Sequence, residues 1–144
     1  MKADICRWSV GATKEAHNDP TALGKNFVQQ YSSLYSSSRA SLAAVYHETK
    51  SQMAFEGSTF VGRAAIAEKL PTLPPGTREI DSFDSTTCLD APVNGVGPAV
   101  LALVTGRIML EGQSNPLHYM QIFLLAVEGG APSCVNEVFS FNYA

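Results

Sequence analysis

The chain lacks the features that would place it in a membrane or in an oxidising compartment. None of its apolar runs approaches the roughly 20 residues that cross a bilayer. No apolar segment typical of a secretory signal follows Lys2. The three cysteines are Cys6, Cys88 and Cys134. This odd, widely spaced set forms neither a disulfide framework nor a metal-ligand pair, and it indicates a reducing compartment.

Clustered positive charge is also scarce. Ten basic and 13 acidic residues give a formal net charge of −3, and the lysines and arginines are scattered singly. A surface that binds nucleic acid needs clustered Lys and Arg, so the sequence argues against nucleic acid as the main partner. Hydrophobic residues make up 45% of the 144 residues, which is typical of one globular domain with a sizeable core.

Motifs that carry chemistry are absent from the sequence. The histidines are His17, His47 and His118, and three aspartates near each other in sequence are Asp81, Asp84 and Asp90. No histidine lies at metal-ligand spacing from another ligand, and there is no glycine-rich nucleotide loop or Gly-x-Ser-x-Gly motif. The aspartates are interpreted as a solvated strand edge and loop. We therefore expect no catalytic residue, no cofactor and no metal.

The first 25 residues differ from the rest of the chain. Residues 1–25 are mostly polar, and their few apolar side chains follow no sustained period. We expect a flexible arm, in which Trp8 is the residue best able to dock and Asp19-Pro20 is a possible helix start. The folded domain is expected to span residues 26–144.

From Asn26 the apolar spacing becomes helical. The first run follows an i, i+4, i+7, i+8 pattern through Phe27, Tyr31, Leu34 and Tyr35. The serines of Ser36–Ser38 compete for backbone hydrogen bonds and interrupt it, and a second short helix is predicted through Leu42, Val45 and Tyr46. A short extended piece is predicted at Met53–Phe55. A third helix is predicted over Arg63–Leu70, which the following prolines end.

The second half of the chain has strand patterns. The predicted strands are Ile80–Cys88, Ala99–Leu110, Leu117–Val127 and Cys134–Asn142, with Asp90–Pro98 as a loop. Helices followed by a strand meander indicate an α+β fold. The residues expected to point into the core are Phe27, Tyr31, Phe55, Leu70, Phe123 and Phe139, a set without a carboxylate.

The segment Ile122–Val127 is apolar on both faces of its strand. An antiparallel sheet with one wet face should instead alternate apolar and polar residues. The helices cover one face, and a second copy of the chain is the simplest cover for the other. The sequence therefore predicts a homodimer built on the outer face of the sheet.

Several blocks of residues stand in a fixed order between Asn26 and Ala144. They are Phe27-Val28-Gln29-Gln30-Tyr31; Arg39, Leu42 and Tyr46; Phe55-Glu56-Gly57 followed by Phe60 and Gly62; Ala65 to Pro74; Val104-x-Gly106; Gln121-x-Phe123; and Asn136-Glu137-Val138-Phe139. In this order the blocks resemble the nuclear transport factor 2 family along the whole of residues 26–144.

The resemblance implies a cone-shaped fold, in which a curved antiparallel sheet wraps around a long N-terminal helix and dimerises through its outer face. In the family, a homodimer carries the GDP-bound form of the GTPase Ran into the nucleus. It also binds phenylalanine-glycine repeats of nuclear pore proteins (nucleoporins). The implied locations are the cytoplasm, the nucleus and the pore complexes of the nuclear envelope, with no enzymatic activity.

The resemblance also implies partner-binding residues. Phe55 stands at the mouth of the cavity that receives an aromatic side chain of Ran, and Glu56 stands where the family pairs a glutamate with a basic residue of Ran. Leu73 and Phe139 match apolar lining positions. Alternatively, these three apolar residues only fill the cone. In the turn after Leu110, animal members of the family carry two acidic residues, and here only Glu111 can take that role.

Two alternative functions stay open. The small subunit of the messenger RNA export heterodimer has the same fold, and its turn contains a Glu-Gly pair like Glu111-Gly112. Isomerases and dehydratases also use this cone, and they place a Tyr, Asp or His inside it. Asp84 or His118 in a deep cavity beside a tyrosine hydroxyl would therefore indicate an enzyme.

Overall fold

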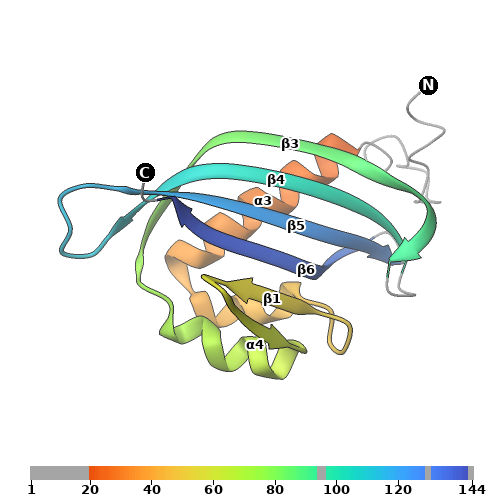
Figure 1. Ribbon diagram of the computed structural model, residues 1–144, viewed down its shortest axis with the longest axis horizontal. Coiled ribbons are helices and arrows are strands. Elements are labelled where there is room, and N and C mark those ends of the chain that lie inside the picture. The colour runs from red at the N-terminus through yellow and green to blue at the C-terminus, as the bar shows by residue number, and fades with distance from the viewer. Residues whose placement is uncertain (1–19, 94–96, 129–130, 143–144) are drawn as a thin grey trace.

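The computed structural model describes residues 20–93, 97–128 and 131–142 (Figure 1). Helix α3 spans Pro20–Ser37, and Pro20 stands in its first turn, where a missing N–H breaks no helical hydrogen bond. The helix thus begins at the possible start noted in the sequence, and residues 20–25 are helical instead of belonging to an arm. Residues 1–19, including Trp8, lie outside the described residues.

Three shorter helices follow the serine-rich end of α3. At this end Ser37 Oγ donates a hydrogen bond to the Ser33 carbonyl oxygen at 2.9 Å, a local bond of the kind that competes with helix extension. The 3-10 helix η1 (Arg39–Val45) follows, where a second short helix was predicted. Helix α4 (Arg63–Lys69) continues into the 3-10 helix η2 (Leu70–Thr72), so the predicted third helix ends as a tighter turn.

Six strands form one curved sheet in the order β2-β1-β6-β5-β4-β3. Their bounds are β1 Gln52–Phe55, β2 Ser58–Val61, β3 Gly76–Val93, β4 Gly97–Leu110, β5 Leu117–Glu128 and β6 Ala131–Asn142. Neighbouring strands are antiparallel except β1 and β6, which are parallel. The predicted α+β fold, a curved sheet wrapped around a long N-terminal helix, is confirmed.

Two parts of the sheet differ from the prediction. Strand β2 was not predicted; it pairs with β1 across a two-residue turn, Glu56–Gly57, whose φ angles of 49° and 89° suit a tight hairpin. The predicted loop Asp90–Pro98 is wrong, because β3 continues to Val93 and β4 begins at Gly97. After a register shift between Cys88 and Val93, Val93 pairs with Gly97, so the pairing of β3 with β4 reaches into this Pro- and Gly-rich sequence. Strand formation here depends on the neighbouring strand.

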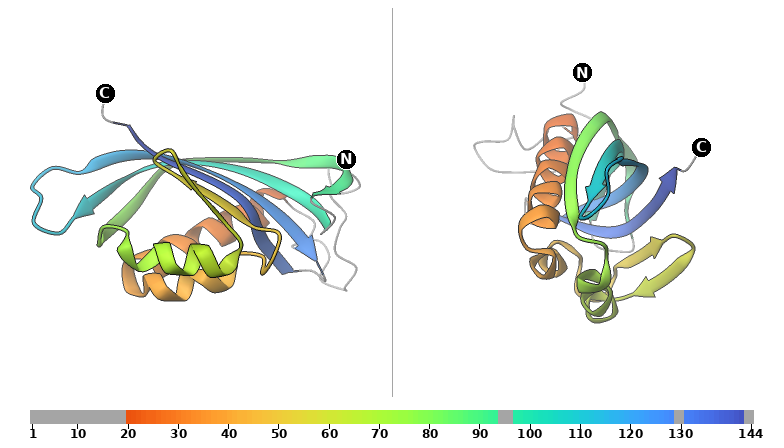
Figure 2. Two further views of the ribbon diagram at one scale, coloured as in Figure 1. Left: turned by 60° about the horizontal axis from the view of Figure 1, so that its bottom comes forward. Right: turned by 90° about the vertical axis from the view of Figure 1, so that its left-hand side faces the viewer.

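The sheet has a covered inner face and an exposed outer face. Helix α3 crosses the concave side and packs on β3 and β4 (Figure 2). Alternation along β5 buries Phe123 inside, whereas Met120 and Ile122 lie outside and are 46% and 38% exposed. All six residues predicted to point inward lie in the core or pack against it. Within the described residues, no helix is long and apolar enough to cross a membrane.

Candidate partner-binding site

An aromatic cluster lies where β1 meets β6. The parallel pairing places Phe55 opposite Phe139, and their rings stack with centroids 4.8 Å apart. Phe141 meets the Phe139 ring edge-on at 5.1 Å, and Tyr119 of β5 stacks on Phe139 at 5.3 Å. Phe139 is buried, whereas Phe55 is half-buried. Phe55, predicted to stand at the mouth of a cavity, and Phe139, predicted to line it, are therefore in direct contact, and Phe55 is the more accessible of them.

Glu56 ties the β1–β2 turn to β6. Its backbone N–H donates to the Phe139 carbonyl oxygen at 3.1 Å, and its carboxylate accepts from the Phe141 backbone N–H at 2.7 Å and from Ser140 Oγ at 3.3 Å. Its φ of 49° is a left-handed conformation that residues other than glycine rarely adopt. The side chain is exposed, so it has a structural role and also remains within reach of a partner.

Leu73 and Glu111 lie on other elements. Leu73 follows η2 and is buried in the core, with an exposed fraction of 3%. Glu111 is exposed in the β4–β5 turn, which projects beyond the end of the sheet (Figure 1). The Glu111 backbone N–H donates to the Pro75 carbonyl oxygen at 3.3 Å. The structure thus joins Phe55, Glu56 and Phe139 in one cluster and places Glu111 on a separate turn, between β4 and β5.

The core below the cluster contains a buried carboxylate, so the prediction of an interior without one is wrong. Glu137 of β6 accepts hydrogen bonds from Tyr46 Oη, from Gln121 Nε2, and from Tyr31 Oη at 3.2 Å. Arg78 donates to Gln121 Oε1 and so extends the network to β3. Burial raises the pKa of Glu137 from its ordinary value, and hydrogen bonds from the tyrosines and Gln121 oppose that rise.

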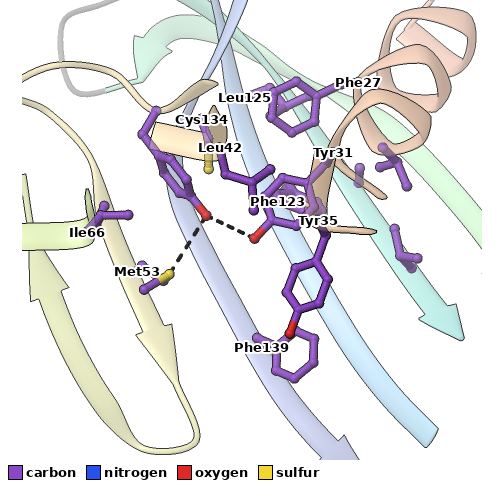
Figure 3. Packing of buried hydrophobic residues seen from close by; sticks show 14 of the residues in the cluster. Phe27, Tyr31, Tyr35, Leu42, Met53, Ile66, Phe123, Leu125, Cys134 and Phe139 are labelled. Carbon is purple, nitrogen blue, oxygen red and sulfur yellow. Dashed lines mark hydrogen bonds between the residues drawn. The ribbon is translucent and has the colours of Figure 1, made fainter. Parts of the chain in front are cut away.

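Aromatic packing surrounds this network. The Tyr31 and Phe27 rings meet Phe123 edge-on at 4.9 Å and 5.3 Å, and Figure 3 shows the three side chains packed together. The Arg78 guanidinium lies 4.4 Å from the Tyr119 ring centroid and 5.6 Å from that of Phe139. The aromatic cluster and the polar network therefore meet at Arg78.

Sequence reasoning missed the network, although the strand pattern contained a signal for part of it. In β5, Tyr119, Gln121 and Phe123 alternate on one face, and in β6 Glu137 stands two residues before Phe139. A polar residue in an inward-facing apolar series must find a buried partner. That argument could have found Gln121 and Glu137, whereas no such series contains Arg78.

The outer face carries an apolar patch over the middle of β4, β5 and β6. The outer patch consists of Leu101, Leu103, Met120, Ile122, Leu124 and Val138. Cross-strand pairing places Leu103 and Val138 on either side of Ile122. Contiguous exposed apolar side chains of this kind mark interaction surfaces.

The residues that would have indicated an enzyme lie outside the cone. Asp84 and His118 are both exposed, as is Asp81, which pairs with Arg107 at 2.8 Å. The two oxygens of buried Glu137 are instead occupied by protein donors. Over residues 20–93, 97–128 and 131–142, no group of three His, Cys, Asp or Glu side chains is placed to hold a metal ion.

Comparison with known proteins gives consistent matches over most of the chain. The sequence model of the nuclear transport factor 2 (NTF2) domain matches residues 23–141. Nuclear transport factor 2 of Schizosaccharomyces pombe is 34% identical over 125 residues, which cover 87% of this chain and 98% of the relative. Nuclear transport factor 2B of Arabidopsis thaliana is 33% identical over 127 residues, covering 88% and 97%. The solved structure of nuclear transport factor 2 from Cryptosporidium parvum is 27% identical with a TM-score of 0.70, covering 83% of this chain and 92% of that one.

Proposed function

This chain belongs to the nuclear transport factor 2 domain family, and we propose that it is a nuclear import carrier that acts as a homodimer. Its cargo is the GDP-bound form of Ran, and it passes through the nuclear pore by binding Phe-Gly repeats of nucleoporins. The proposed locations are the cytoplasm, the nucleus and the pore complexes of the nuclear envelope. The protein has no enzymatic activity in this proposal.

The observation that carries the proposal is the stacked pair of Phe55 and Phe139 with Glu56 beside it. Phe55 is half-buried and lies on a ring that the core holds in place. A partner's aromatic side chain can therefore pack against a rigid apolar surface that has a carboxylate at its edge. Anchoring of this kind is typical of the few residues that dominate an interface.

Leu73 and Glu111 support the site less directly. Leu73 is buried in the same core cluster as Phe139, so we assign it a packing role. Glu111 is exposed on the projecting turn and can meet a basic residue on the rim of a large partner. A rim charge of this kind changes the association rate and its salt dependence more than the affinity.

The outer patch supports a dimer. A twofold interface uses the same surface of both copies, and the outer patch is central on the sheet and rich in large apolar side chains. Two copies also supply two equivalent sites for Phe-Gly repeats, so weak contacts add through a high effective concentration. A nucleoporin fragment with several Phe-Gly repeats should be retained by the immobilised protein at low salt, and loss of that retention would contradict this part of the proposal.

The absence of catalysis is supported by the way Glu137 is bonded. A general acid or base must reach a substrate proton. Glu137 is buried, and its oxygens accept hydrogen bonds from Tyr31, Tyr46 and Gln121. The interior carboxylate therefore belongs to a structural hydrogen-bond network. This argues against Glu137 as a general acid or base, and so against the enzyme alternative.

The decisive experiment is a binding measurement with purified Ran in its GDP-loaded and GTP-loaded forms. The wild-type chain should bind the GDP form and discriminate against the GTP form. Phe55→Ala should weaken binding of the GDP form, while Lys25→Ala, an exposed residue on α3, serves as the control. If wild type binds neither form, the carrier function is wrong. A chain that is then monomeric or insoluble alone, and stable only with a larger partner of the same fold, supports the export-subunit alternative.

A further inference from the structure

Three cations and three aromatic rings form one row that passes through the partner-binding site. In order along this cation–aromatic row, the residues are Lys69, Phe55, Phe139, Arg78, Tyr35 and Arg39. The centroid or charge-to-centroid separations between successive members are 5.6, 4.8, 5.6, 4.8 and 6.0 Å. The row includes three positive charges, and Arg78 among them interacts electrostatically with buried Glu137. Lys69 stands at the end of the row that adjoins the accessible Phe55 ring.

Lys69 is the cation nearest the accessible ring. Its Nζ lies 5.6 Å from the Phe55 centroid and 5.5 Å from the Phe60 centroid, so the ammonium group makes cation–π contacts with two rings. The residue is half-buried, and within the described parts of the chain it forms no ion pair. Its charge therefore faces the site without a neutralising carboxylate of its own.

The nearby carboxylates are directed elsewhere. Glu56 accepts hydrogen bonds from the Phe141 backbone and from Ser140, both on β6. Glu137 lies inside the cone and is bonded to Tyr46 and Gln121. Because β1 stands between β2 and β6, the Glu56 carboxylate lies on the β6 side of Phe55 and Lys69 lies on the β2 side.

Arg78 adds positive charge behind the rings. It is only 8% exposed, and its Nε and Nη1 atoms have no hydrogen-bond partner among the described residues. Its described side-chain hydrogen bond goes to the neutral amide of Gln121. Because Glu137 interacts electrostatically with Arg78, the charge of Arg78 is partly balanced inside the cone, and Lys69 is the row's more exposed positive charge beside Phe55.

We infer that Lys69 is a specificity-determining contact, and that the partner segment seated on Phe55 carries a carboxylate side chain on the β2 side of its aromatic residue. This inference rests on the proposed function, since it adds a second chemical feature to the segment that occupies the same site. With Glu56 on the opposite side, the two charges fix the direction in which the segment crosses the Phe55 ring. An acidic residue meets Lys69, and a basic residue meets Glu56.

The first test measures the affinity of GDP-loaded Ran for Lys69 variants. Lys69→Met keeps an unbranched apolar side chain over the rings and removes the charge, so the affinity should fall about tenfold and its salt dependence should decrease. Lys69→Glu should lower the affinity further, and Lys69→Arg should restore most of it. Lys25→Met is the matched control because it removes the same charge from an exposed site on α3. Circular dichroism confirms that each variant is folded.

The outcomes separate this inference from the carrier function. If Phe55→Ala weakens binding of Ran but Lys69→Met and Lys69→Glu bind like wild type, the carrier function stands and the carboxylate contact is wrong. If wild type does not bind Ran, the carrier function is wrong, and the contact is decided by the peptide test below.

The peptide test needs no Ran. Acetylated and amidated pentapeptides Gly-Glu-Phe-Gln-Gly, which carries one carboxylate, and Gly-Gln-Phe-Gln-Gly, which carries none, are titrated into isotope-labelled protein, and amide shifts at Phe55 and Lys69 report binding. The wild type should prefer the acidic peptide, and Lys69→Met should lose that preference. Equal affinity for both peptides, or a preference that persists in Lys69→Met, overturns the inference.

Discussion

Replacing Ile122 by lysine should separate the two copies of the proposed homodimer without unfolding either one. Ile122 lies at the centre of the outer patch, where Leu103 and Val138 flank it on the adjacent strands. It is 38% exposed in the single chain, so the substitution removes little packing from the core. Phe123, the neighbouring position, is fully buried and would disrupt the fold instead.

The magnitude follows from burial and symmetry. Fully burying an isoleucine side chain stabilises by about 1.5–3 kcal/mol, and the exposed part of Ile122 accounts for roughly 1 kcal/mol of this per copy. An unpaired lysine at a dry interface adds a desolvation cost of several kcal/mol even after relaxation. A twofold interface contains each substitution twice. The dissociation constant of the dimer should therefore rise at least about a thousandfold, which corresponds to a loss of ~4 kcal/mol in dissociation free energy.

Sedimentation velocity across the micromolar range measures the change. The wild type should sediment as a dimer, Ile122→Lys as a folded monomer, and Val61→Lys as a dimer, because Val61 is 65% exposed on the edge strand β2, outside the outer patch. A stable wild-type monomer would refute the homodimer. A dimer that survives Ile122→Lys would show that the interface lies elsewhere.

Three further predictions test the site and its support. Glu56→Lys should weaken binding of GDP-loaded Ran and, because it removes the bond to Phe141, should also lower stability by about 1 kcal/mol or less; unchanged binding would remove Glu56 from the site. Gly106→Ala places a Cβ 2.7 Å from the Tyr119 hydroxyl and against the β3 backbone, so calorimetry should show a loss of about 1–3 kcal/mol. For Glu137, burial raises the folded-state pKa above the ordinary 4.5, so the folded protein binds this proton more tightly than the unfolded chain. The stability that this proton contributes is then lost as the pH rises through the folded-state pKa. The unfolding free energy of Glu137→Gln should therefore increase relative to that of wild type as the pH rises above 4.5. A difference in unfolding free energy between the two proteins that does not change with pH contradicts this.

The sequence predicted those parts of the fold that have long periodic patterns. The strands β4, β5 and β6 lie within a few residues of their predicted bounds, because each has ten or so residues of strand pattern. Strand β2 has only four residues and is stabilised by pairing with β1, so its own sequence gave no sufficient signal. The length of β3 is likewise set by its pairing with β4.

The candidate site was predictable only in part. The resemblance pointed to Phe55 and Phe139, but their contact comes from the parallel pairing of β1 with β6, which joins residues far apart in the sequence. Lys69 was seen only as one helical residue of a motif, since its position over two rings depends on how α4 packs on the β1–β2 hairpin. Arg78 was not identified, because β3 was predicted to begin only at Ile80.

The buried network explains how a small domain can present a rigid aromatic site. Hydrogen bonds from α3, from Tyr46 after η1 and from β5 converge on Glu137, two residues before Phe139 on the same strand. An apolar core would be at least as stable, since burying a charge costs more than most ion pairs and hydrogen bonds return. What the network adds is geometry: with every donor directed at one carboxylate, β6 has one position relative to its neighbours, and Phe139 is held against Phe55. A preorganised site of this kind loses less entropy when a partner binds.

We therefore expect Glu137→Gln, which cannot accept from all of these donors at once, to speed amide hydrogen exchange at Phe139 and to weaken partner binding even where its melting temperature equals that of wild type. Unchanged exchange at Phe139 would show that packing alone positions the ring.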